Sequence, residues 1–146
     1  RFAERMKASE LVPGDVLNRI IMYVSSMMEM KSSMGVIVAA PTAGSCGALP
    51  GAVFGVADVL GKSREERIEA MLAAGMIGVF IAAHSTFAAE EGGCMAECGS
   101  GAAMGAAAIV LLMGGSFKQQ LGAASMALQS SLGMTCDTLA NREEAP

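Results

Sequence analysis

The stretch SREERIEAMLAAGMIGVFIAA, residues 63–83, decides the fold class of this chain. Ser63 and Glu66 have the spacing of a capping box, in which the hydroxyl and the carboxylate each bond an otherwise unpaired amide at a helix N-terminus. The apolar run behind them is long enough for a helix that continues to about Ala83. The sequence therefore predicts a long helix here.

Other segments repeat this helical pattern. Asp15 follows the break at Pro13-Gly14 and is placed to cap a helix over residues 16–30. Further helices are expected over 51–60, over 92–113 ending at Gly114-Gly115, and from a second capping box at Ser116–Gln119 to about residue 132.

Strand–helix alternation is missing after residue 50, and residues 34–40 are the one ambiguous run. A doubly wound parallel sheet is hard to build from such a pattern. We therefore expect an all-α fold, a compact bundle of Ala-, Gly- and Met-rich helices with a Gly-rich loop after residue 40. Residues 1–146 are expected to form a single domain.

Composition supports closely packed helices and bears on which kinds of partner the chain can bind. Hydrophobic residues make up 53% of the chain, but aromatic residues only 4%. The net charge is −4 without a basic stripe, which argues against nucleic acid because phosphate binding needs clustered Lys and Arg. The charged start Arg1–Lys7 shows no secretory signal, and four cysteines in such a chain indicate a reducing, cytoplasmic location.

Residues 99–117 carry no charge and raise the question of a membrane span. Most of them are Gly, Ala or Ser, whose small side chains are only weakly apolar. A buried core helix is the preferred interpretation, and no membrane partner is expected.

The segment EGGCMAECGSG, residues 91–101, places Cys94 and Cys98 four positions apart beside Glu97, and Cys136 follows far downstream in GMTCD. Thiolates that converge from distant segments suit a soft metal or an iron–sulfur cluster. The spacing fits no common zinc pattern. Buried thiols that act as small hydrophobes remain the alternative interpretation.

The loop 41–50, PTAGSCGALP, offers backbone amides and the hydroxyls of Thr42 and Ser45 to an anionic group such as a carboxylate. A tight connection between packed helices would use the same residues. His84 is the only histidine and follows an apolar stretch, which is typical of a structural residue rather than a catalyst.

Taken together, APTAGSCGALPG at 40–51, EGGCMAE at 91–97 and GMTCD at 133–137 closely resemble the α subunit, or α domain, of iron–sulfur-dependent L-serine dehydratase (L-serine ammonia-lyase). The resemblance runs from about Met34 to Pro146. It implies a [4Fe–4S] cluster held by three cysteines, with one iron open to substrate.

Two of the family's ligand positions fall on Cys94 and Cys136, whose Cα atoms should then lie within roughly 12 Å of each other. The third would follow directly after Pro146, so 1–146 is interpreted as a C-terminally truncated α domain. Cys46 and Cys98 match no ligand position and are expected to be packing residues.

The resemblance implies β-elimination of water from L-serine to give pyruvate and ammonia, a step in amino-acid catabolism and gluconeogenesis, with iron activating the hydroxyl. No catalytic base is identified in this chain, so the base is sought in the family's β subunit or β domain, the expected partner in an oligomer. Thr42 and Ser45 are candidates for binding the substrate carboxylate. Alone, the fragment is expected to be inactive. The alternative function is a non-catalytic cluster-carrying or redox-sensing subunit.

Overall fold

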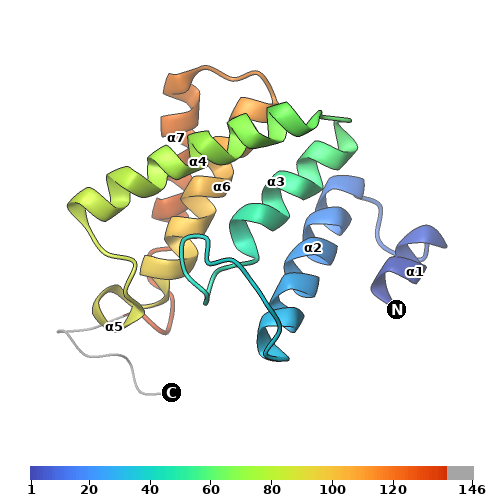
Figure 1. Ribbon diagram of the computed structural model, residues 1–146, viewed down its shortest axis with the longest axis horizontal. Helices are drawn as coiled ribbons and strands as arrows, with labels where there is room; N and C mark the ends of the chain where they lie inside the picture. Colours follow the sequence, from blue (N-terminus) through green and yellow to red (C-terminus); the bar gives the residue numbers. More distant parts are fainter. Residues whose placement is uncertain (138–146) are drawn as a thin grey trace.

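The computed structural model describes residues 1–137, which form an all-helical arrangement without a β-strand in that range (Figure 1). This confirms the predicted all-α fold class. The elements are α1 (Phe2–Lys7), α2 (Asp15–Ser32), α3 (Ala48–Val59), α4 (Arg64–His84), α5 (Ala89–Gly92), the π-helical turn η1 (Met95–Gly99), α6 (Ser100–Leu112) and α7 (Phe117–Ser130).

Helix α6 is the central element of the bundle. It packs against α3, α4 and α7, and α2 lies on the outer side of α3 (Figure 1). Residues Ala103, Ala107 and Ala108 of α6 are almost completely buried. The prediction of a buried core helix within residues 99–117 is therefore confirmed. By length and composition alone, Arg64–His84 and Met95–Leu112 are apolar enough to cross a membrane, and just over half of the second (56%) is buried inside the fold.

Small residues let these helices approach closely. A methyl group on Gly55 of α3 would lie 2.9 Å from the backbone nitrogen of Ile20 in α2. On the other side of α3, a methyl group on Gly105 of α6 would meet the Cβ of Ala52 at 3.4 Å. Side chains of ordinary size at these positions would push the helices apart.

Both predicted capping boxes are present. Ser63 accepts a hydrogen bond from the Glu66 amide, and the Glu66 carboxylate accepts one from the Ser63 amide. Ser116 and Gln119 form the same pair at the start of α7. The hydrogen bond from the Lys62 ammonium, followed by that from the Ser63 amide, lowers the pKa of Glu66 to about 2.

The predicted cap at Asp15 is wrong. Gly14 is the N-cap residue of α2, with φ 152°, and Asp15 lies inside the first helical turn without a capping bond. The carboxylate can still interact favourably there with the helix dipole. Helix α1 was not predicted. Its main contact is with α2 and it has no buried residue, so no buried apolar face marks it in the sequence.

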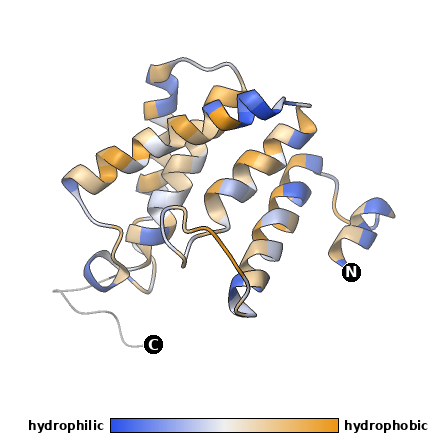
Figure 2. Ribbon diagram, viewed as in Figure 1, coloured by the Kyte–Doolittle hydropathy of each residue, from blue (hydrophilic) through white to orange (hydrophobic). Residues whose placement is uncertain are grey.

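The predicted helix over 92–113 is interrupted. Gly93 adopts φ 69°, a conformation that glycine reaches without strain, and it separates α5 from the π-helical turn η1. Residues 34–40 form neither helix nor strand but an extended, exposed apolar segment after α2, orange in Figure 2.

A polar network joins α2, α3 and α4. Asp58 of α3 accepts hydrogen bonds from the Tyr23 hydroxyl of α2 at 2.5 Å and from Arg67 of α4 at 2.7 Å. The Tyr23 bond, and after it the Arg67 guanidinium, holds the pKa of Asp58 below its ordinary value.

The close contact at Gly55 gives the first prediction. Gly55→Ala should lower the free energy of unfolding by about 1–3 kcal/mol, because the methyl group meets backbone atoms that cannot move aside. Gly122→Ala, at an exposed position of α7 where nothing lies within 4 Å, is the matched control and should raise stability by about 0.4–1 kcal/mol. Urea unfolding measures both, and equal effects would contradict the proposed close packing.

Candidate functional site

Cys94 and Cys136 come together from segments 42 residues apart. Their Cα atoms are 5.9 Å apart and their sulfurs are joined in a disulfide. The predicted approach to within 12 Å is therefore confirmed. Cys94 immediately precedes η1 and is partly buried, and Cys136 lies in the exposed segment that follows α7. The pair thus lies at the surface of the bundle, near the N-terminal end of α6, which η1 directly precedes.

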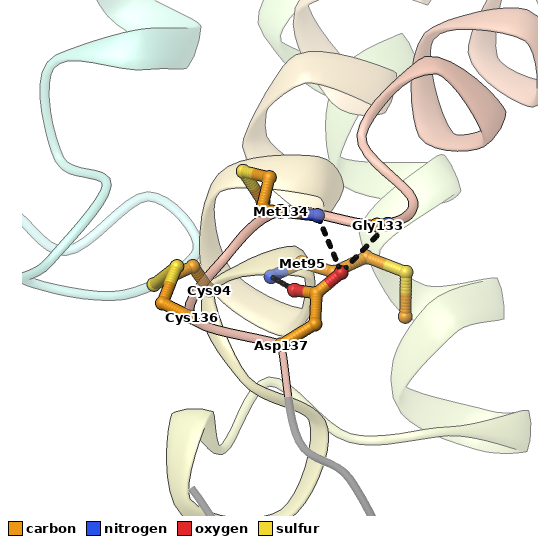
Figure 3. Close-up of a disulfide and its surroundings, with 6 residues drawn as sticks. All are labelled: Cys94, Met95, Gly133, Met134, Cys136 and Asp137. Atoms are coloured by element: carbon orange, nitrogen blue, oxygen red, sulfur yellow. Dashed lines mark hydrogen bonds between the residues drawn. A yellow bond between two sulfur atoms is a disulfide. The ribbon is translucent and has the colours of Figure 1, made fainter. Parts of the chain in front are cut away.

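The carboxylate of Asp137 links the same two segments (Figure 3). One oxygen, Oδ2, accepts hydrogen bonds from the amides of Gly133 at 2.9 Å and Met134 at 3.0 Å. The other, Oδ1, accepts one from the amide of Met95, the first residue of η1, at 3.3 Å. The Asp137 side chain therefore forms hydrogen bonds with both segments that carry the cysteines.

The loop 41–47 lies beside this pair of segments. A methyl group on Gly44 would overlap the carboxylate of Glu97, so this side chain rests directly on the loop backbone. A methyl group on Gly101, at the start of α6, would lie 3.6 Å from both Pro41 and Ser45. The Gly-rich loop and residues 97–101 are thus in contact, and the cysteine pair adjoins the loop through η1.

Within the loop, Thr42 and Ser45 bond each other. Their hydroxyl oxygens are 3.1 Å apart, and the Ser45 amide donates to the Thr42 hydroxyl at 3.3 Å. Ser45 is only 4% exposed, whereas Thr42 is half-buried. The hydroxyl of Thr42 is therefore the more accessible of the two.

The other two cysteines and the histidine are not part of the Cys94–Cys136 pair. Cys46 is buried at 2% exposure and its thiol contacts the sulfur of Met28 at 3.9 Å, so it packs as expected. The expectation that Cys98 also packs is wrong, because the π-helical turn leaves Cys98 exposed. His84 is exposed at the end of α4, with Nδ1 3.0 Å from the Phe80 carbonyl oxygen.

A cavity of about 820 Å³ lies between α4, α6, α7 and η1. Its lining is mainly apolar and includes neither cysteine of the pair, nor Thr42, Ser45 or Glu97. The cysteine pair therefore does not line the cavity, although Met95, the residue after Cys94, does. Its lining includes Phe80, Ile81, His84, Met95, Ala96 and Leu128.

Within residues 1–137, no group of three or more His, Cys, Asp or Glu side chains is arranged to hold a metal ion. Two thiols converge there, and the third ligand expected after Pro146 lies outside the described residues. The donor chemistry fits a cluster, because thiolates are the ligands that iron–sulfur clusters require. In this structure the two sulfurs are bonded to each other, and a cluster held by both cysteines would require this disulfide to be reduced.

Two residues of the site carry roles that sequence reasoning missed. From the sequence, Asp137 is only part of a motif, and Glu97 only a neighbour of the cysteines. An Asp side chain often accepts hydrogen bonds from backbone amides three or four residues earlier in a turn. Asp137 has this spacing from Met134 and Gly133, so its bonds to these two amides could have been suggested from the sequence. The contacts with Met95 and Gly44 are long-range and leave no local signal.

Comparison with known proteins agrees with the family resemblance seen in the sequence motifs. The family model described as "Serine dehydratase alpha chain" matches residues 2–146. The "L-serine dehydratase, alpha chain" of Peptoniphilus asaccharolyticus is 39% identical over 146 residues, which is all of this chain and 50% of that protein. The "Probable L-serine dehydratase, alpha chain" of Bacillus subtilis is 35% identical over 97% of this chain and 47% of its own length.

A further relative, the "L-serine dehydratase TdcG" of Escherichia coli, is 37% identical over 92% of this chain but only 30% of its own length. No significant match to a solved structure was found. The chain thus spans about half the length of the two alpha chains it resembles. The family match over residues 2–146, together with relatives at 35–39% identity, shows that this chain belongs to the serine dehydratase alpha-chain family.

Proposed function

We propose that this chain is the cluster-binding part of an enzyme that eliminates water from L-serine to give pyruvate and ammonia. The observation that carries the proposal is the 5.9 Å approach of Cys94 and Cys136 beside the Gly-rich loop, in a member of this family. The names of its relatives supply the substrate, L-serine. The cytoplasm, where thiols stay reduced, is the location that suits such a site.

Cys94 and Cys136 would supply two thiolate ligands to a [4Fe–4S] cluster, and the third would come from beyond the described residues. Hydroxide is a poor leaving group, and a bound cluster supplies Lewis-acid chemistry at the substrate hydroxyl. The exposed position of Cys136 leaves this site open to a partner chain or domain. The partner that we propose is the β subunit or β domain of the same enzyme.

The Gly-rich loop would hold the substrate carboxylate. Loop amides and the half-buried hydroxyl of Thr42 can donate hydrogen bonds to it, while buried Ser45 supports the hydroxyl of Thr42 from within. Glu97 places a negative charge against the same loop, where it would favour the substrate ammonium.

The α-proton must be removed by a base as the hydroxyl leaves, and the product 2-aminoacrylate then hydrolyses to pyruvate and ammonia. Asp137 is unsuited to this task, because its two oxygens already accept three backbone hydrogen bonds. We therefore place the base on the partner.

Anaerobic reconstitution tests the proposal. The full-length chain, with its partner, iron and sulfide, should become brown and convert L-serine to pyruvate. Cys94→Ala and Cys136→Ala should each abolish both properties, because each removes a cluster ligand. Cys98→Ala is the matched control, an exposed cysteine in the same segment, and should retain both.

If the cluster binds but L-serine is not converted even with the partner present, the result would instead favour the alternative function, a cluster-carrying or redox-sensing subunit. Retention of cluster and activity in Cys136→Ala would contradict the ligand assignment.

The Gly-rich loop gives a separate prediction. Thr42→Val should raise the KM for L-serine by roughly tenfold, because it removes a hydrogen-bond donor at nearly constant volume. Thr42→Ser keeps the hydroxyl and should restore most of the affinity. The pyruvate assay measures both, and an unchanged KM in Thr42→Val would remove Thr42 from the substrate site.

A further inference from the structure

Asp137 is the feature that connects the two cysteine-bearing segments by hydrogen bonds. Among the described residues, no other hydrogen bond joins residues 132–137 to η1. Helix α7 packs on η1, but the chain beyond Ser131 is largely exposed and includes Gly133 in a left-handed conformation, φ 82°. Packing alone therefore does little to hold Cys136 near Cys94.

We propose that Asp137 is a positioning residue that holds Cys136 against Cys94 before any cluster is bound, so that the two thiols form a ready-made pair. The inference deepens the proposed cluster site, and its test does not require enzyme activity.

The chemistry of the three bonds requires a carboxylate. One oxygen takes the Gly133 and Met134 amides, which shape the turn that carries Cys136, and the other takes the Met95 amide next to Cys94. Asparagine has one accepting oxygen, and its NH₂ group would face an N–H donor at the other end. An Asp137→Asn substitution therefore breaks the connection at one end while it barely changes side-chain size.

The energetic effect follows from loop entropy. A glycine-containing segment free to sample many conformations brings its thiol to a given point only rarely. Bonds from a charged acceptor are stronger than neutral ones and restrict this sampling. The Asp137 bonds thus raise the effective concentration of one thiol at the other.

Disulfide closure in the cluster-free protein reads out this effective concentration. Glutathione disulfide serves as the oxidant: one thiolate of the pair displaces reduced glutathione, and the second thiolate displaces the other. The two electrons lost by the thiols thus appear as two molecules of reduced glutathione. The full-length chain should carry Cys98→Ala throughout, so that exposed Cys98 cannot compete, and peptide mapping identifies the Cys94–Cys136 bond.

Asp137→Asn should slow formation of this bond by roughly tenfold, because the Met95 end or the turn end of the connection is lost. Asp137→Glu, which keeps the carboxylate, should recover part of the rate. Asp15→Asn is the matched control, since Asp15 is exposed in α2 and none of the described hydrogen bonds uses its carboxylate, and it should close at the wild-type rate. Closure of Asp137→Asn at the wild-type rate would overturn the proposal.

Amide hydrogen exchange keeps the proposal testable if Asp137→Asn fails to fold. In the wild-type protein, cluster-free and reduced, the amides of Gly133 and Met134 should exchange more slowly than their exposed neighbours, because Asp137 is their acceptor. Exchange at the rate of an unstructured chain would overturn the proposal.

Cluster loss provides a last readout. After anaerobic reconstitution, Asp137→Asn should release iron to a chelator faster than the wild-type protein and Asp15→Asn do, and equal rates would count against the positioning role. If the wild-type protein binds no cluster at all, the proposed function fails, while the disulfide-closure rates still decide the role of Asp137.

Discussion

Close backbone contact between helices, made possible by glycine and alanine, is the constraint on which the rest of this structure depends. Helix α3 carries glycines that approach α2, and α6 carries glycines that approach α3. Because α3 begins directly after the Gly-rich loop and α6 begins directly after η1, the same close packing brings loop 41–47 against residues 97–101. The candidate site is thus a consequence of how the bundle packs, and its parts come from the ends of core helices.

The cysteine pair depends on a second, weaker constraint. Cys94 is held by η1, which is joined to the core helix α6, whereas Cys136 lies in an exposed segment after α7. Besides the disulfide itself, hydrogen bonds from Asp137 join the two segments that carry these cysteines. The proposed cluster would therefore bind at the surface of the helical core and not inside it. Its exposure also leaves room for the partner that we expect to complete the active site.

Much of the fold could be predicted from the sequence, because local chemistry determines helix starts. The capping boxes at Ser63 and Ser116 are found as predicted, and no strand interrupts the helices within residues 1–137. Predictions failed where short-range geometry decides the outcome. Gly93 permits a break in the helix that the apolar periodicity does not reveal. In the π-helical turn that follows, Cys98 is exposed and not packed in the core.

The site was predictable in part, and mainly through its resemblance to a known family. Spacing alone left cysteine ligation and cysteine packing both open, and the three motifs together singled out Cys94 and Cys136. The contacts of Glu97 with the loop and of Asp137 with η1 join residues far apart in sequence, so no local pattern reveals them.

The most direct test of the central claim is to locate iron in the anaerobically reconstituted full-length protein by anomalous diffraction at the iron absorption edge. We predict an iron–sulfur cluster within bonding distance, about 2.3 Å by analogy with other metal–thiolate bonds, of the sulfurs of both Cys94 and Cys136. Iron bound elsewhere, with these two cysteines still joined in a disulfide, would contradict the account.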